Sequence, residues 1–138
     1  MIFQKKISLA TRGFNDIIDI TPSLRSILQE SRIKNGLLAV FVPGSTAGLT
    51  TIEYEPGLIE DIPEMLEKIA PMQARYHHDQ TWHDGNGYAH LRAALIGPSL
   101  TIPFEQSQMQ LGTWQQVVLI DFDNHPRQRH LHVQIQGE

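Results

Sequence analysis

The C-terminal segment RHLHVQIQ, residues 129–136, alternates strictly between polar and apolar side chains from His130 onward. Leu131, Val133 and Ile135 fall on one face, and a polar residue occupies each position between them. Side chains of a β-strand point alternately to opposite faces, so this pattern is typical of an antiparallel strand buried on one face only. The segment therefore predicts a half-buried strand at the end of the chain.

The remaining segments predict strands and helices in an irregular order. Further strands are expected at residues 2–9, 14–20, 37–42, 49–55, 99–104 and 113–122. Helices are expected at residues 21–36, 56–70 and 89–97. Thr21 is the expected N-cap of the first helix and Gly36 its stop, and the apolar run LLAVFV indicates a buried central strand. Because there is no regular βαβ alternation, the expected fold class is α+β: one compact domain with a largely antiparallel sheet or sandwich, two main helices and a short one.

Composition and charge exclude several classes of protein. A formal charge of −4 argues against a general nucleic-acid or anionic-membrane binder, since both need a basic surface. The chain has no cysteine, so any transition metal must be held by nitrogen and oxygen ligands. No apolar run approaches the ~20 residues of a membrane span, and the first residues lack the apolar core of a signal peptide. We therefore expect a soluble, cytoplasmic protein without nucleic-acid or membrane partners.

The segment HHDQTWHDGNGYAH, residues 77–90, is expected to form a polar loop and holds four of the chain's seven histidines. His78, His83 and His90 are spaced five and seven apart, which suits a loop folded around a divalent ion with three or four imidazole or carboxylate ligands. Asp84 would orient an imidazole or bind the ion directly. The spacing matches no established zinc signature, so a polar surface loop is an equal alternative.

The other histidines favour simpler interpretations. His130 and His132 lie two apart on one strand face and could chelate an ion, but a solvated outer face explains the alternation better. His125 stands in a turn marked by Asn124 and Pro126, and it is expected to be a turn residue.

Two hydroxyl-bearing segments follow apolar elements. Ser45 and Thr46 lie in the glycine-bounded turn PGSTAG, where backbone N–H groups and hydroxyls can form an anion nest. A tight strand-to-strand turn explains the same residues, and the P-loop spacing and lysine are absent. Ser99, which follows the short helix, would offer its hydroxyl in a similar way.

Three longer side chains are further candidates. Arg92, two residues after His90, is either a phosphate ligand or a surface arginine on a helix. Trp114 and Gln115 are expected on opposite faces of a strand, where one of them would contact a ligand ring, although a core position is the usual place for a tryptophan. No GxSxG elbow or Rossmann glycine pattern is present, so nucleophilic catalysis has little support.

Two segments, YHHDQTWHDGNGYAHLRAALIGPSLTIPF and LGTWQQVVLIDFD, together resemble the YjbQ-like family, also called the secondary thiamine-phosphate synthase family. The resemblance runs nearly from end to end, from QKKISL to the terminal VQIQGE. It implies a small α+β protein that assembles as a homotrimer, with a divalent metal in a site at the subunit boundary. By the family pattern, the central site residues are His78, Asp84, Asn86 and His90. The positions that match the family near its pocket are Ser45, Thr46, Ser99, Gly112, Thr113 and Gln115.

The chain departs from the family at Gly44, where many members carry a histidine that resembles a metal ligand. His83 stands where other members often have an acidic residue, and we infer that it replaces the missing ligand. The predicted metal ligands are therefore His78, His83 and His90. A zinc-like ion is expected, because imidazoles prefer it, whereas magnesium would suit a diphosphate substrate.

The resemblance implies a metal-dependent enzyme acting on a small phosphorylated metabolite. The named activity is a weak thiamine phosphate synthesis, in which a transferase joins hydroxymethylpyrimidine diphosphate to thiazole phosphate and releases diphosphate. The expected catalytic residues are His83, Asp84 and His90. The expected substrate-binding residues are Ser45, Thr46, Asn86, Arg92, Ser99, Thr113 and Gln115. Two alternatives stay open: a metal-assisted hydrolase of a small substrate, and a non-catalytic trimer that holds a metal or metabolite.

Overall fold

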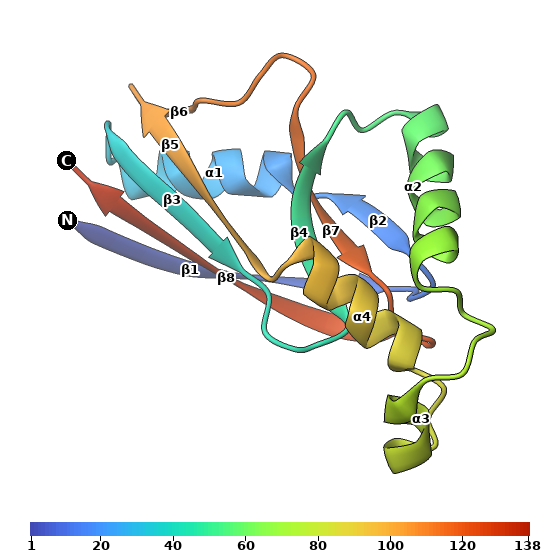
Figure 1. The fold of residues 1–138 in the computed structure, drawn as a ribbon. Coiled ribbons are helices and arrows are strands. Elements are labelled where there is room, and N and C mark those ends of the chain that lie inside the picture. Colours follow the sequence, from blue (N-terminus) through green and yellow to red (C-terminus); the bar gives the residue numbers. More distant parts are fainter.

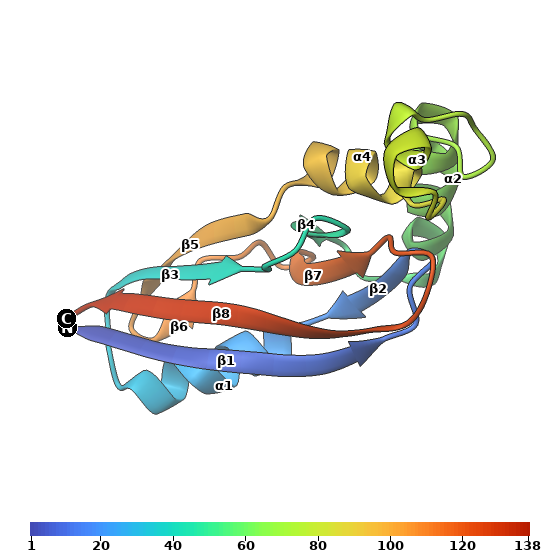
Figure 2. The same cartoon turned by 90° about the horizontal axis from the view of Figure 1, so that it is seen from below.

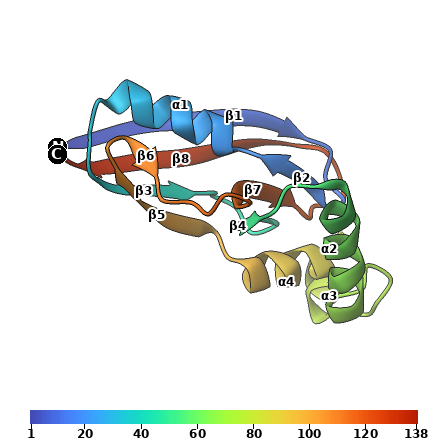
Figure 3. The same cartoon turned by 90° about the horizontal axis from the view of Figure 1, so that it is seen from above.

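The computed structural model describes residues 1–138 as eight strands and four helices. The strands are β1 (Ile2–Thr11), β2 (Asp16–Asp19), β3 (Gly36–Phe41), β4 (Ala47–Ile52), β5 (Ser99–Glu105), β6 (Gln108–Met109), β7 (Gln116–Asp121) and β8 (Arg127–Gly137). The helices are α1 (Thr21–Ser31), α2 (Pro56–Ile69), α3 (His77–Trp82) and α4 (Gly87–Ile96). The two termini lie together at one end of the molecule, and α2, α3 and α4 gather at the opposite end (Figure 1, Figure 3). None of the helices is both long and apolar enough to cross a membrane.

Two antiparallel sheets form the layers of the fold. The five-stranded sheet has the order β1-β8-β3-β5-β6, and the three-stranded sheet has the order β2-β7-β4. One core lies between the larger sheet, α1 and one face of β7, where Leu24, Leu119 and Val133 are buried. A second core lies on the other face of β7, where Ile120 packs with Ala89 of α4 (Figure 2). β7 is therefore buried on both faces and joins the two cores.

The predicted α+β class with antiparallel sheets is confirmed. β8 pairs with β1 and β3, and its alternation buries Leu131, Val133 and Ile135 as the sequence predicts. β3 is the central strand of its sheet, again as predicted, but only one of its faces is buried. Leu37 and Phe41 are 42% and 45% exposed on the outer face, so the apolar run does not mark a strand covered on both sides.

The first helix differs from the prediction at both ends. Thr21 is not the N-cap: its hydroxyl accepts a hydrogen bond from the backbone N–H of Val117 at 2.8 Å, which ties α1 to β7. The helix ends at Ser31 because Arg32 adopts a left-handed conformation with φ 61°, and Gly36 begins β3 instead. The sequence does not predict the two-residue strand β6.

Buried ion pairs fix the turn between β7 and β8. Asp121 and Asp123 are fully buried, and Arg129 binds both carboxylate oxygens of Asp121, from Nε at 2.7 Å and from Nη2 at 2.8 Å. Arg127 Nε donates to Asp123 at 3.0 Å. Burial alone would raise the pKa of Asp121, but hydrogen bonds from Arg129 and Thr11 lower it below its usual value. Both carboxylates are therefore held in their charged form inside the fold.

Arg92 is a buried structural residue rather than a phosphate ligand or a surface arginine. It is fully enclosed, and its Nε and Nη2 donate to the carbonyl of Ala70 at 3.0 and 2.8 Å. Its Nη1 donates to Asn15 at 2.8 Å and its Nη2 to Glu67 at 2.8 Å. The guanidinium lies 5.0 Å from the ring centre of Tyr88. It therefore fastens α4 to the end of α2 and to the β1–β2 loop.

Replacing Arg92 should therefore lower the stability of the folded protein. We expect Arg92→Ala to lower the free energy of unfolding by about 3 kcal/mol, because it leaves a cavity and unpaired acceptors. Arg92→Lys should not restore it, since an ammonium lacks the fork that reaches three partners. Urea denaturation measures both, and Leu95→Ala, an exposed position on the same helix, is the control. An Arg92→Ala protein within about 0.5 kcal/mol of the wild type would contradict this role.

Candidate metal centre

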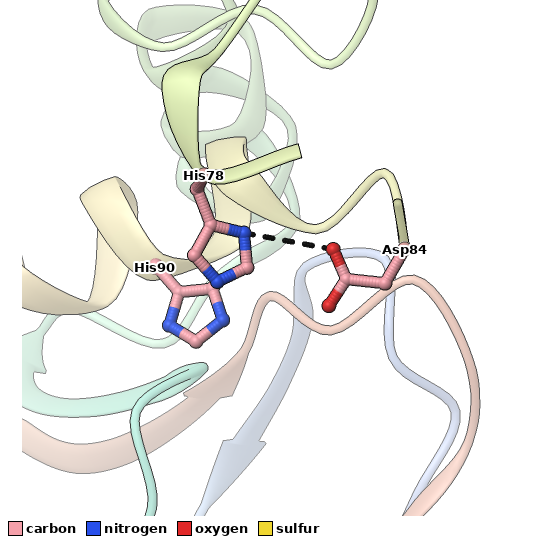
Figure 4. A group of neighbouring side chains, drawn as sticks. All are labelled: His78, Asp84 and His90. Atoms are coloured by element: carbon pink, nitrogen blue, oxygen red, sulfur yellow. Dashed lines mark ion pairs between the residues drawn. The ribbon is translucent and has the colours of Figure 1, made fainter. Parts of the chain in front are cut away.

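Three potential ligands meet between α3 and α4. His78 of α3, Asp84 of the following loop and His90 of α4 each offer one atom, and these atoms lie within 4.8 Å of one another (Figure 4). His78 Nδ1 is 3.5 Å from Asp84 Oδ1, and the two imidazole rings lie 4.1 Å apart at 38°. Ligand atoms that share one tetrahedral zinc ion are about 3.3–3.6 Å apart, given bonds of about 2.0–2.2 Å. The cluster is thus slightly wider than a metal-bound arrangement.

A close approach of α3 to the start of α4 creates this cluster. The Asp79 carboxylate accepts a hydrogen bond from the backbone N–H of Gly87 at 2.9 Å. A Cβ at Gly87 would lie 2.6 Å from the Cβ of Tyr76, so only glycine permits this contact. The expected loop therefore contains a short helix, and that helix places His78 against His90.

Hydrogen bonds from Asn124 in the β7–β8 turn hold the loop that carries Asp84 in place. Asn124 donates from its side chain to the Asp84 carbonyl at 2.7 Å and from its backbone to Asn86 Oδ1 at 3.1 Å. Asp84 Oδ1 accepts from the backbone N–H of Asn86 at 3.1 Å. Asn86 is buried at the N-cap of α4, so it positions the loop. The structure gives it no open face toward a substrate.

The electrostatics of the two imidazoles suit a bound cation. His78 Nδ1 is enclosed and has no hydrogen-bond partner, because the carboxylates of Asp79 and Asp84 are 3.6 and 3.5 Å away. An enclosed polar atom without a partner is costly, and a metal ion would satisfy it. Burial, and then the nearby His78, lower the pKa of His90 below its ordinary value. Its imidazole is therefore neutral near pH 7, as a ligand must be.

His83 lies outside the cluster that the sequence predicts it to complete. It stands at the C-cap of α3 with φ 54°, and it is exposed. The left-handed turn at this residue directs the chain back toward α4, which brings Asp84 into the third position. The structure thus joins His78 and His90, as predicted, with Asp84 in place of His83.

A cavity of about 200 Å³ lies next to His90. It is lined mainly by Gly44, Ser45, Ala47, His90, Ala93 and Pro98. Ser45 therefore borders the cavity, as expected of a substrate-binding residue. Thr46 does not: it is buried, donates to Asp123 at 2.8 Å and accepts from Arg129 Nη2 at 2.7 Å.

The other predicted contact residues lie elsewhere in the chain. Ser99 is exposed at the start of β5, and Thr113 is exposed in the β6–β7 loop. Gln115 accepts from the backbone of Gly112 at 2.9 Å and donates to Thr51 at 3.0 Å, at a separate hollow. None of these residues lines the cavity next to His90.

Two further expectations concern exposed aromatic rings. Trp114 is 72% exposed in the loop before β7, so it is neither in a strand nor in the core. His130 and His132 are exposed on the outer face of β8, and His130 shares a 2.9 Å hydrogen bond with Ser8. On this chain both histidines are thus exposed, as the interpretation of an outer strand face predicts.

Sequence reasoning missed the buried charged residues that bind Thr46. Arg129 and Asp123 form part of the buried network behind the PGSTAG turn. A signal for Arg129 is present in the alternation of β8, because residue 129 is in register with Leu131 and therefore points inward. Asp123 follows an apolar run directly, and a carboxylate at such a place is often buried with a partner.

Comparison with known proteins identifies relatives over nearly the whole chain. The family model described as UPF0047 protein YjbQ-like matches residues 5–138. A UPF0047 protein of Methanothermobacter thermautotrophicus is 37% identical over 137 residues, covering 99% of this chain and 94% of that protein. A UPF0047 protein of Archaeoglobus fulgidus is 39% identical over 124 residues, covering 90% of this chain and 94% of that protein.

Solved structures share the fold as well. A YbjQ-like protein of unknown function from Sulfolobus solfataricus superposes with a TM-score of 0.94 at 32% identity, covering 100% of this chain and 99% of that one. A hypothetical protein from Aeropyrum pernix gives a TM-score of 0.92 at 31% identity, covering 99% of each chain. Neither description carries an activity.

The direction of the pKa shift of His90 can be measured. NMR titration of the metal-free protein should give His90 a pKa below the ~6.5 of a free histidine. His78→Ala should raise it and Asp84→Asn should lower it further, because His78 opposes protonation and Asp84 favours it. The unfolded chain binds this proton at a higher pH, so the contribution to stability is present above pH ~6.5 and is lost as pH falls through the folded pKa. A His90 pKa above 6.5 would contradict the burial that the structure shows.

Proposed function

This chain belongs to the UPF0047 YjbQ-like family, and we propose that it is a divalent-metal-dependent enzyme that acts on a small phosphorylated substrate. The observation that supports the proposal is the convergence of His78, Asp84 and His90, with the enclosed and unpartnered Nδ1 of His78 among them. Such an arrangement costs stability without an ion and gains it with one.

The donor set favours a zinc-like ion. Two imidazoles and one carboxylate are typical of catalytic zinc sites, which keep further positions open for water or substrate. Magnesium prefers oxygen ligands and remains the alternative if the substrate itself supplies phosphate oxygens. Bound here, the ion would supply Lewis-acid stabilisation of negative charge on a phosphate oxygen. His78 and His90 would hold it from two helices, and Asp84 would neutralise part of its charge.

The chain's own residues would position the substrate next to this site. Ser45 offers a hydroxyl at the cavity edge, and Ala47, Ala93 and Pro98 form apolar parts of its wall. A cavity of about 200 Å³ is smaller than a complete drug-sized pocket, so it fits one group of a substrate rather than the whole molecule. The reacting part of the substrate would lie nearer His90.

Thiamine phosphate synthesis is the specific reaction that we propose to test. A bond forms between the pyrimidine methylene carbon and the thiazole nitrogen, and the bond from that carbon to diphosphate breaks. Charge on the departing diphosphate needs neutralisation, which the proposed ion and the Ser45 donor would supply. Arg92 takes no part in this proposal, because its side chain is fully buried and donates to the carbonyl of Ala70.

The test measures turnover of the two thiamine precursors by untagged protein with and without added zinc. We expect thiamine phosphate to form, chelation to abolish it and zinc to restore it. His90→Ala should lose activity by about a hundredfold or more, whereas His77→Ala, an exposed neighbour, should keep it. Product formation that survives chelation and His90→Ala would overturn the proposal.

The same assay separates the two alternatives. A metal-assisted hydrolase would release phosphate from a single phosphorylated compound, with no requirement for the second precursor and with the same sensitivity to chelation. A non-catalytic binding protein would retain metal or metabolite tightly and show no turnover across a panel of such compounds.

We also propose that the protein assembles as a homotrimer in the cytoplasm. Thr113 and Gln115 match the family's pocket positions but lie away from the cavity of their own chain, which is what a site between subunits would require. The exposed outer face of β3, with Leu37 and Phe41, is an apolar surface suited to burial against another copy. Sedimentation equilibrium should give three times the chain mass, and a monomer at micromolar concentration would contradict the assembly.

A further inference from the structure

Arg129 carries one unused pair of donors. The residue is only 8% exposed, and its Nε and Nη2 bind Asp121, while Nη2 also donates to Thr46 at 2.7 Å. These three bonds fix the plane of the guanidinium. Nη1 donates to no group of the chain, and it is not among the enclosed atoms that lack a partner. Its N–H groups are therefore open to solvent.

Gly44 lies directly beside the Nη1 donors of Arg129. A Cβ at this position would lie 3.1 Å from Arg129 Nη1 and would meet nothing else within 4 Å. Gly44 also has φ +108°, a conformation that residues with a side chain rarely adopt. Gly44 lines the cavity together with Ser45 and His90, so the free donors of Arg129 lie beside one residue of its wall.

Ser45 and His90 supply the polar side chains that line this cavity, and no carboxylate lines it. The carboxylates of Asp121 and Asp123 are fully buried and paired with Arg129 and Arg127, so their charges are balanced inside the fold. Besides the imidazole of His90, the hydroxyl of Ser45 borders the cavity, and the Nη1 of Arg129 lies beside Gly44 in its wall. Arginine N–H groups bind phosphate and carboxylate oxygens in particular, and apolar walls strengthen such bonds.

We propose that Arg129 Nη1 and Ser45 Oγ form a subsite for an oxygen anion, namely the phosphate group of the substrate, and that Gly44 keeps it accessible. The subsite deepens the proposed function and rests on it only in placing the phosphate next to the metal centre. A Cβ at residue 44 would lie 3.1 Å from Nη1, tighter than an ordinary van der Waals contact.

The test is titration of inorganic phosphate into the full-length protein, in metal-free and in zinc-loaded form, with ¹⁵N signals of the Arg129 side chain as the readout. Phosphate should bind the metal-free protein and shift these signals. Zinc should tighten binding by about tenfold or more, since it offsets the exposed carboxylate of Asp84. Ser45→Ala should weaken binding by about fivefold without changing the fold, because Ser45 is exposed.

Two matched glycine variants isolate the role of Gly44. Gly44→Ala should weaken phosphate binding by about tenfold, because its Cβ covers Nη1. Gly97→Ala is the control: Gly97 has φ +95°, yet a Cβ there meets nothing within 4 Å, so it adds similar backbone strain without an obstruction. We expect Gly97→Ala to bind phosphate as the wild type does. Equal affinities in Gly44→Ala and wild type would overturn the proposal.

The ¹⁵N spectrum of the wild-type protein tests the phosphate subsite even if a variant does not fold. Arg129 signals that stay unchanged at saturating phosphate would overturn the subsite. Acetate that binds more tightly than phosphate would overturn the assignment to a phosphate group. Zinc binding without phosphate binding would reject this inference and leave the proposed function standing. Phosphate binding by a chain that retains no divalent ion, even after incubation with zinc, would support the subsite and reject the metal centre.

Discussion

The buried pair between Arg129 and Asp121 is the interaction on which the site depends. Neither charge is acceptable in the interior without the other, so the pair holds the end of β7 and the start of β8 in one arrangement. Thr46 joins the same network and thereby fixes the turn before β4. The β7–β8 turn also carries Asn124, which fastens the loop of Asp84. β7, β8 and the turn between them thus determine where the cavity and the candidate ligands lie.

The sequence predicted those parts of the fold that follow from local periodicity. The alternation of β8 was sufficient to predict that strand, and the helix expected at residues 56–70 corresponds to α2. The capping role of Glu55, which accepts from two backbone N–H groups, was not predicted, because residue 55 was assigned to the preceding strand. Contacts between distant residues were not readable in the same way. Arg92 sits on an ordinary helix, and only the approach of α2 and the β1–β2 loop makes it structural. The exposed Trp114 likewise shows that residue type alone does not place a side chain.

The candidate centre was predicted in part, for a physical reason. His78 and His90 were identifiable because histidines are concentrated in one segment. The choice between His83 and Asp84 depends on the left-handed turn at residue 83, which no spacing rule encodes. The alternation of β8 places residue 129 inside the fold, but it does not reveal that Asp121 and Thr46 bind Arg129 and leave its Nη1 free. Local pattern locates candidate groups, and tertiary contacts decide which of them converge.

The measurement that tests the central claim most directly is the zinc content of untagged protein after incubation with the ion and dialysis. We expect about one ion per chain in the wild type and in His83→Ala, and none in the double variant His78→Ala, His90→Ala. Asp84→Ala should retain the ion poorly, since it loses the carboxylate. A wild-type chain that retains no ion, or a His83→Ala chain that loses it, would contradict a metal centre built on His78, Asp84 and His90.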